Sequence, residues 1–249
     1  MNETIEMLLK HKSIRKFEER SLTEEQIHTI VQSAQAASTS SYIQAYSIIG
    51  VKDVAKKEEL AELAGNQNYV ASSGHFFIFC ADLHRHEIIG DMKGTDLKES
   101  LDSTEKFMVA VIDAALAAQN ATVAAESLGL GICYIGGIRN HVQEVSELLN
   151  LPHRVIPLFG LTVGYPAQDP GVKPRLPLEH IYYEDEYPQE QTLYKQQLNE
   201  YDKVVSAYYH ERTGGKRANT WSEQMSQMLA EPKRMFMKDF VEKKGFSKK

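Results

Sequence analysis

The sequence predicts a layered domain of strands and helices, in the α/β or α+β class. Short apolar runs typical of buried strands alternate with helical patterns over the first two thirds of the chain. That order favours stacked layers over a helix bundle or a sandwich of sheets. The 249 residues are 42% hydrophobic and 25% charged, which is enough for a real core in an ordinary globular protein.

Two helices are expected before the first strand. A short apolar stripe predicts a helix that ends near His11. Thr23–Gln26 fits a capping box, and apolar residues follow it at helical spacing, so a second helix begins at Thr23.

Four strands and the helices between them complete this region. The expected strands are 46–51, 75–83, 132–138 and 155–163. Charged residues predict a helix that ends at Leu63, and another helix is expected over 140–149. The run HFFIFCADL at 75–83 is dense in phenylalanine, which indicates a strand buried on both faces.

Residues 107–128 are long and apolar enough to raise the question of a membrane span. Asp113 and Glu126 interrupt the run, and a carboxylate in the middle of a span is costly in lipid. A buried helix is therefore expected. Its many alanines would let another element approach closely, as in a central helix or a subunit interface.

The charge balance excludes a general attraction to nucleic acid or to acidic membranes, because the formal net charge is −6. Any anion must be held by a local cluster. The N-terminus carries acids where a secretory signal is basic, so a cytoplasmic protein is expected. Cys80 and Cys133 lie in apolar runs and are expected to be buried free thiols.

Familiar catalytic motifs are absent: no P-loop, HExxH, GxSxG or paired CxxC occurs. GLGICYIGG at 129–137 fails as a dinucleotide fingerprint, and Gly129 and Gly131 are interpreted as helix terminators. Gly136–Gly137 suits either close approach to a flat ligand or a plain bulge. The run 84–86 (HRH) is interpreted as a solvated loop, and no metal site is expected.

Three polar segments could hold a phosphorylated ligand. HKSIRKF at 11–17 concentrates positive charge, KPRLP at 173–177 presents two cations on a stiff loop, and 38–41 (STSS) supplies four hydroxyls. Each segment alone is more often a solvated face or a helix cap. Their combination in one acidic chain favours a phosphorylated cofactor.

The tail differs from the preceding region. Proline-rich sequence after Gly164 is followed by two amphipathic helices, separated by TGGKR, and the second of these begins with a capping box at Thr220–Glu223. Helices with apolar stripes but no strand indicate an arm that needs a surface to lie on.

These segments, with AASTSSYIQ, LAGNQNYV, AAESLGLG, YIGGIRN, LPLFGLTVGYPA and YYHERTGGKR…TWS, resemble the NADPH-dependent flavin reductase and oxygen-insensitive nitroreductase family of FMN proteins. The resemblance runs from about residue 3 to the C-terminus in one register. It implies an α+β fold: a three-layer α-β-α core with a mostly antiparallel sheet and a C-terminal helical arm, in a domain-swapped homodimer. It also implies an FMN-binding core at 1–165 and an extension at 166–249 within the same structural domain.

The resemblance also assigns the site. The residues it implies for FMN are His11, Lys12, Ser13, Arg15, Thr39, Ser40, Ser41, Gln67, Ile135, Gly136, Gly137, Lys173 and Arg175, and those for NADPH are Arg139, Arg212, Lys216 and Arg217. Position 12 is lysine where such enzymes commonly have arginine, so the charge is kept but a bidentate contact is lost. Thr39 stands among the usual serines and keeps the hydroxyl.

The chemistry implied is ping-pong hydride transfer from NADPH through FMN to free flavins, nitroaromatics or quinones, with no protein acid, base or metal. One alternative is another reduced-FMN enzyme of the superfamily, for example in reductive dehalogenation or flavin breakdown. The other is a non-enzymatic protein that binds a phosphorylated ligand.

Overall fold

The computed structural model describes residues 1–249, which divide into two compact units: unit 1 is Met1–Pro170 with Arg234–Lys249, and unit 2 is Gly171–Lys233. The strands of unit 1 are β1 (Tyr46–Val51), β2 (His75–Asp82), β3 (Gly131–Ile135) and β4 (Val155–Gly164). Its helices are α1 (Glu3–Leu9), α2 (Glu24–Gln35), η1 (Ser40–Tyr42), α3 (Val54–Leu63), α4 (Tyr69–Ser72), α5 (His84–Lys93), α6 (Lys98–Leu101), α7 (Thr104–Ser127), η2 (Gly136–Arg139), α8 (Val142–Leu148) and α11 (Met237–Lys243). Unit 2 contains η3 (Leu178–His180), α9 (Gln191–Arg212) and α10 (Trp221–Ala230).

The four strands form one sheet in the order β1-β2-β4-β3, and every neighbouring pair is antiparallel. The expected antiparallel sheet is thus confirmed. The third strand is shorter than expected, because the chain turns into the 3₁₀ helix η2 at Gly136.

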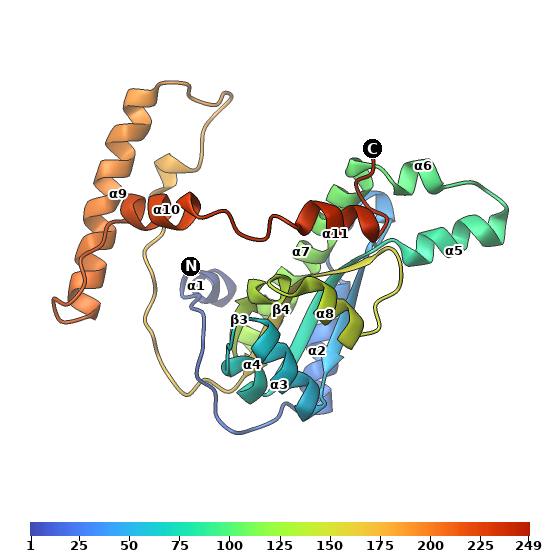
Figure 1. Cartoon of the computed structure of the whole chain (residues 1–249). Coiled ribbons are helices and arrows are strands. Elements are labelled where there is room, and N and C mark those ends of the chain that lie inside the picture. Colours follow the sequence, from blue (N-terminus) through green and yellow to red (C-terminus); the bar gives the residue numbers. More distant parts are fainter. The chain divides into compact units, whose positions relative to one another are not determined.

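Helices cover both faces of the sheet, as the ribbon shows (Figure 1). Every residue of β2 is buried, and its side chains alternate between the faces. Phe77 and Phe79 pack with residues of α2 and α7, whereas Phe76 and Ile78 pack with residues of α3 and α8. The three-layer α-β-α core is confirmed, and the double burial explains why this strand is so rich in phenylalanine.

Helix α7 is the central helix of one layer. Most of its alanines, among them Ala114, Ala118 and Ala121, are buried, and its C-terminal half packs with α2 and the sheet. By length and mean hydropathy (1.5) α7 could cross a membrane, but half of that apolar window is buried inside the protein. Core helices of soluble proteins pass the same test.

Two local expectations were wrong. Residues 84–86 do not form a loop but begin α5, where the Asp82 carboxylate accepts a hydrogen bond from the His84 amide at 2.9 Å. Gly131 does not end a helix but begins β3, where a Cβ would lie 2.6 Å from the Ile14 side chain. Gly129 does have the left-handed backbone of a helix terminator, with φ of 75°.

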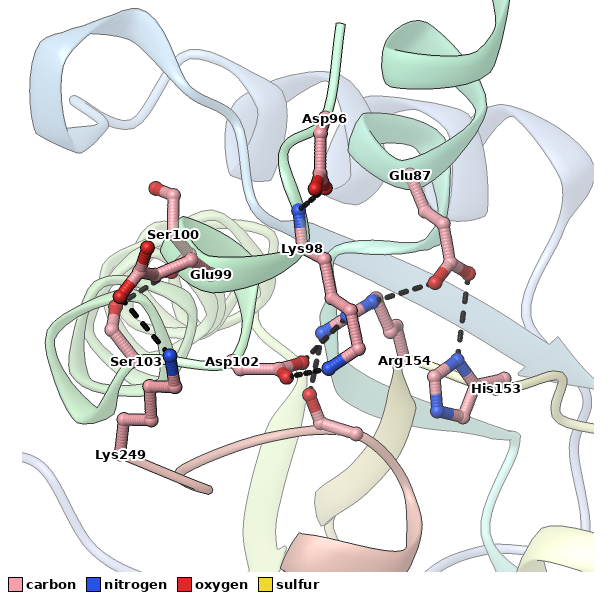
Figure 2. A network of polar contacts seen from close by, with 11 residues as sticks. Glu87, Asp96, Lys98, Glu99, Ser100, Asp102, Ser103, His153, Arg154 and Lys249 are labelled. Carbon is pink, nitrogen blue, oxygen red and sulfur yellow. Dashed lines mark hydrogen bonds and ion pairs between the residues drawn. The ribbon is translucent and has the colours of Figure 1, made fainter.

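The C-terminal segment is fixed to the rest of unit 1 by a polar network around the buried Arg154 (Figure 2). The Arg154 guanidinium donates to Asp102 at 2.7 Å, to Glu87 at 2.9 Å and to the Gly245 carbonyl at 2.5 Å. Lys98 also donates to Asp102. Burial raises the pKa of the Asp102 carboxyl, but the hydrogen bonds from Lys98 and Arg154 outweigh this effect and lower it. The network therefore favours a charged carboxylate inside the protein.

Unit 2 contains helices and no strand, as expected for the arm. Helices α9 and α10 pack through the Tyr201 and Trp221 rings, whose centroids are 5.6 Å apart. The Ser222 amide donates to Asp202 at 2.8 Å, and the capping box predicted at Thr220 is present.

Candidate functional site

The basic segment runs along the edge of the sheet. Ser13 forms a parallel bridge with Ile132, and the Ile14 amide donates to the Ile132 carbonyl at 2.8 Å. Lys12 and Ile14 line a cavity of about 550 Å³ beside α1. Ser13 and Arg15 contact Cys133 on β3. The segment thus presents Lys12 and Ile14 to the cavity beside α1, and Ser13 and Arg15 to β3.

Arg15 joins a chain of neutral polar groups. Its guanidinium lies close enough to the Tyr69 hydroxyl to lower the pKa of that group, and the hydroxyl donates to Gln67 Oε1. Gln67 Nε2 in turn donates to the Ala64 carbonyl at 2.7 Å. The structure therefore brings together two residues assigned to FMN, Arg15 and Gln67, through Tyr69.

Sequence reasoning missed Tyr69, although it lies in the quoted segment LAGNQNYV. Burial and the nearby Cys133 raise the pKa of Tyr69, and Arg15 partly offsets the increase. Burial likewise raises the pKa of Cys133, against hydrogen bonds from Ser13 and Arg15. Both cysteines are free and buried, as predicted.

The glycine pair at the end of β3 adjoins the same group. A Cβ on Gly137 would lie 2.2 Å from the Ala64 carbonyl and 2.4 Å from Gln67 Nε2, so packing within the chain already requires glycine there. A Cβ on Gly136 would meet only the flexible end of Arg139, at 3.2 Å. Between the two, Gly136 is the position that leaves backbone open to a ligand, and Ile135 before it is buried.

Two residues of the basic segment lie against carboxylates, and one of them is a cation. His11 Nδ1 lies 2.7 Å from Glu126 Oε1 at the end of α7, and Lys12 Nζ lies 2.7 Å from Asp169 Oδ1. Part of the local positive charge is therefore neutralised within the chain. The assignment of these two residues to FMN stays a prediction.

The hydroxyl segment does not lie with the basic segment in one chain. The Ser40 amide donates to Asp113 in the middle of α7, whereas His11 contacts Glu126 near its end. At 1.5 Å of rise per residue, these two contacts are about 20 Å apart along the helix. Thr39, Ser40 and Ser41 thus form a separate cluster.

The Arg139 side chain lies near Gly136 and near a second arginine, Arg234. It donates to the Leu158 carbonyl, and burial lowers its pKa, with a smaller contribution from Arg234. Arg234 donates to Asn140 Oδ1 at 2.7 and 3.0 Å. Two guanidinium groups therefore lie near each other with only neutral partners in unit 1, and Arg234 carries no motif that sequence reasoning could have used.

The remaining predicted cations belong to unit 2. Lys173 Nζ and Arg217 Cζ lie 5.6 and 4.2 Å from the centroid of the Tyr209 ring. Arg212 donates to the Tyr208 hydroxyl at 2.5 Å. Arg175 lies near Tyr201 and partly offsets the burial that raises the pKa of that tyrosine.

The turn between α9 and α10 requires a left-handed backbone at two positions, and both are glycine. Gly214 and Gly215 have φ of 60° and 81°, and the Gly215 amide donates to the His210 carbonyl at 2.7 Å. Lys216 follows in this turn and is exposed. The turn holds the basic residues in one local arrangement.

Comparison with known proteins decides the family. The nitroreductase family model matches residues 8–165, and the model of the C-terminal domain of the nitroreductase family matches residues 173–249. The chain belongs to the nitroreductase family. No group of three or more His, Cys, Asp or Glu side chains in this family member could hold a metal ion.

Full-length relatives agree with this assignment. The chain is 56% identical over 248 residues to the FMN reductase (NADPH) of Bacillus subtilis (strain 168), with complete coverage of both chains. The solved structure of NfrA1 from B. megaterium is 64% identical with a TM-score of 0.98, over 99% of this chain and all of that one. The NADPH:FMN oxidoreductase of Vibrio harveyi, solved in complex with NAD+, is 41% identical with a TM-score of 0.90 over the whole of both chains.

The donor set fits FMN on chemical grounds. Exposed Arg15 has only neutral partners in unit 1 and can take a phosphate or another anion. Gly136 leaves open backbone, and Gln67 carries an amide that can donate to and accept from a ring edge. Cation, amide and bare backbone are what a phosphorylated planar cofactor requires.

Proposed function

We propose that this protein is an FMN-dependent oxidoreductase that uses NADPH to reduce free flavins, nitroaromatics or quinones. The observation that carries the proposal is Arg15, a cation with neutral partners only in unit 1, linked through Tyr69 to Gln67. Gln67 lies against Gly137, the neighbour of the open backbone of Gly136. Membership of the nitroreductase family and the full-length relatives support the same activity.

The protein's part in the reaction is to bind and to set charge. Bound FMN would supply the two-electron chemistry, taking hydride from NADPH and passing it to an acceptor in ping-pong order. His11, Lys12, Ser13 and Arg15 would hold the phosphate end of the cofactor. Lys173 and Arg175 would stabilise negative charge on the ring, and Thr39, Ser40 and Ser41 would supply hydroxyls.

A second set of cations would receive NADPH. Arg212, Lys216 and Arg217 flank the turn after α9, and Arg139 lies beside Arg234 in unit 1. Guanidinium groups with neutral partners suit the 2′-phosphate, which two planar forks can grip bidentately. NADPH is therefore preferred over NADH in this proposal.

A homodimer in the cytoplasm completes the proposal. Met108, Ile112 and Leu116 form a stripe at four-residue spacing on α7 and are 53%, 46% and 43% exposed, although α7 is otherwise a core helix. A second copy covering this stripe could also bring its hydroxyl cluster to the basic segment of the first. In sedimentation, Ile112→Glu should shift the protein toward monomer, whereas Val54→Glu, at an exposed apolar site on α3, should leave the dimer intact.

The activity is tested anaerobically on the purified protein. Its visible spectrum should show bound flavin, and NADPH should bleach that band faster than NADH does. Arg175→Ala should lower flavin content and turnover together, whereas Lys195→Ala, an exposed cation on α9, should change neither. A protein that stays colourless after addition of FMN would falsify the proposal.

A further inference from the structure

The segment that carries the hydroxyls has an unusual backbone. Ser41, Tyr42 and Gln44 have φ of 48°, 60° and 56°, in the left-handed region that residues with a side chain rarely adopt. Such conformations are strained and persist only where the surroundings impose them. Three within four residues require a strong local constraint.

Asp113 supplies that constraint from α7. Its Oδ1 accepts a hydrogen bond from the Ser40 amide at 2.9 Å, and its Oδ2 accepts one from the Ala45 amide at 3.0 Å. These two amides stand on either side of the left-handed stretch. One carboxylate therefore closes the segment into a loop of fixed shape.

The position of this carboxylate is costly in itself. Asp113 is 0% exposed and forms no ion pair, and burial of a carboxylate without a cation is unfavourable unless hydrogen bonds offset the lost hydration. The Ala45 amide is buried as well and needs an acceptor. The Asp113 carboxylate finds its donors, and the Ala45 amide its acceptor, only when the loop keeps this shape.

The loop presents polar groups that the chain itself does not use. Thr39 and Ser40 are half-buried and Ser41 is exposed, and no hydrogen bond within the chain engages any of their hydroxyls. Tyr42 is 83% exposed despite its aromatic ring. The strained backbone therefore holds polar side chains at a surface that faces outward.

We propose that Asp113 is a positioning residue of the FMN site, which holds the hydroxyls of Thr39, Ser40 and Ser41 ready for the cofactor. The inference rests on the proposed function, because it takes FMN as the ligand of these hydroxyls. Asp113 acts through the two backbone amides and does not touch the ligand. Without it the free loop samples other conformations, and FMN must order the loop on binding.

The first test compares FMN affinity in full-length apoprotein by quenching of flavin fluorescence. Asp113→Asn keeps the volume but loses one acceptor, and its FMN Kd should rise about 10-fold, because FMN must then order the loop as it binds. Asn120→Ala is the control, because it removes a 3.1 Å hydrogen bond from the same helix to the Ser33 carbonyl, away from the loop. An Asp113→Asn protein with wild-type FMN affinity would overturn the inference.

A double-mutant cycle separates positioning from a general structural role. In a Thr39→Ala/Ser40→Ala/Ser41→Ala background the three hydroxyls are gone, so Asp113→Asn should raise the Kd by much less than 10-fold. A purely structural role predicts the same factor in both backgrounds. Equal factors would therefore count against positioning.

Hydrogen exchange in the wild-type protein tests the loop without any variant. If Asp113 fixes the loop, the Ser40 and Ala45 amides are protected already in the apoprotein and change little when FMN binds. Fast exchange that slows only with FMN would show that the ligand shapes the loop, and would overturn the inference even if Asp113→Asn does not fold. Failure of wild-type protein to bind FMN would instead count against the proposed function.

Discussion

Two polar groups in unit 1 use charge in opposite ways. Around Arg154, which is 2% exposed, every charge has a partner: Asp102 and Glu87 balance Arg154, and Lys98 joins them (Figure 2). Around Arg15, the partners are a tyrosine and a thiol. A neutralised cluster can hold a fold together, whereas a cation with neutral partners keeps its affinity for an anion that the chain does not contain.

The groups around Arg154 and Arg15 also differ in burial. The Arg154 network ties the C-terminal segment to the core and is closed to solvent on its arginine side. Arg15 is exposed, with its neighbours arranged on the inner side. Breaking the first group should therefore cost stability, and breaking the second should cost ligand affinity.

The largest expected effect is on the closed network. Arg154→Ala leaves Asp102 with one cation and frees the Gly245 carbonyl, so the free energy of unfolding should fall by about 3–5 kcal/mol. Urea denaturation followed by circular dichroism measures this. The control Lys52→Ala breaks an exposed ion pair with Glu24 and should cost less than about 1 kcal/mol. Equal losses in both variants would show that the buried network contributes no more than an exposed ion pair.

A third kind of polar group is a buried ring nitrogen that has no hydrogen bond. His75 is buried, its Nε2 has no hydrogen bond, and burial, with smaller contributions from Lys52 and Lys57, lowers its pKa to about 4 despite the opposing effect of Glu24. The folded protein keeps this ring neutral while the unfolded chain binds a proton below about pH 6.5. Stability should therefore fall as the pH drops from 6.5 to 4, by about 3 kcal/mol in total.

Denaturation at a series of pH values checks this slope. His75→Gln should flatten the dependence in that window, because it removes the titrating ring. His141→Gln, at an exposed histidine on the surface of unit 1, should leave the slope unchanged. If the slope persists in His75→Gln, other groups cause it.

A substitution in the group around Arg15 should change the affinity for FMN rather than the stability of the fold. Arg15→Ala should raise the FMN Kd about 10- to 100-fold, the factor for losing a charge-assisted hydrogen bond, with little change in melting temperature. Lys16→Ala is the matched control, since Lys16 is the neighbouring exposed cation and has no assigned role. A melting temperature lowered as much as in Arg154→Ala would remove the distinction between the two groups.

The smallest expected change in FMN affinity is at Tyr69, the tyrosine between Arg15 and Gln67. Tyr69→Phe removes only the hydroxyl shared by Gln67 and Arg15, so the FMN Kd should rise about 5-fold, near 1 kcal/mol. Tyr165→Phe serves as control, because its hydroxyl also donates to a glutamine, Gln26, at 3.2 Å. Equal affinity in the two variants would show that Tyr69 does not organise the site.

The sequence by itself determined the local elements and the family. The capping boxes at Thr23 and Thr220, the doubly buried strand β2 and the central helix α7 were all predicted, because capping, periodicity and apolar runs act over a few residues. The basic and hydroxyl segments were recognised for the same reason. Whether they bind FMN stays a prediction.

Only the tertiary structure decided which groups meet. Nothing in the local pattern shows that Asp113 bonds Ser40 and Ala45, or that Arg154 reaches Asp102 and Gly245 from far along the chain. The interruption at Asp113 read from sequence as an obstacle to a membrane span; in the fold it is an acceptor for two backbone amides. Such pairings depend on how the layers stack, because a buried charge is stable only where the packing of distant segments brings it a partner.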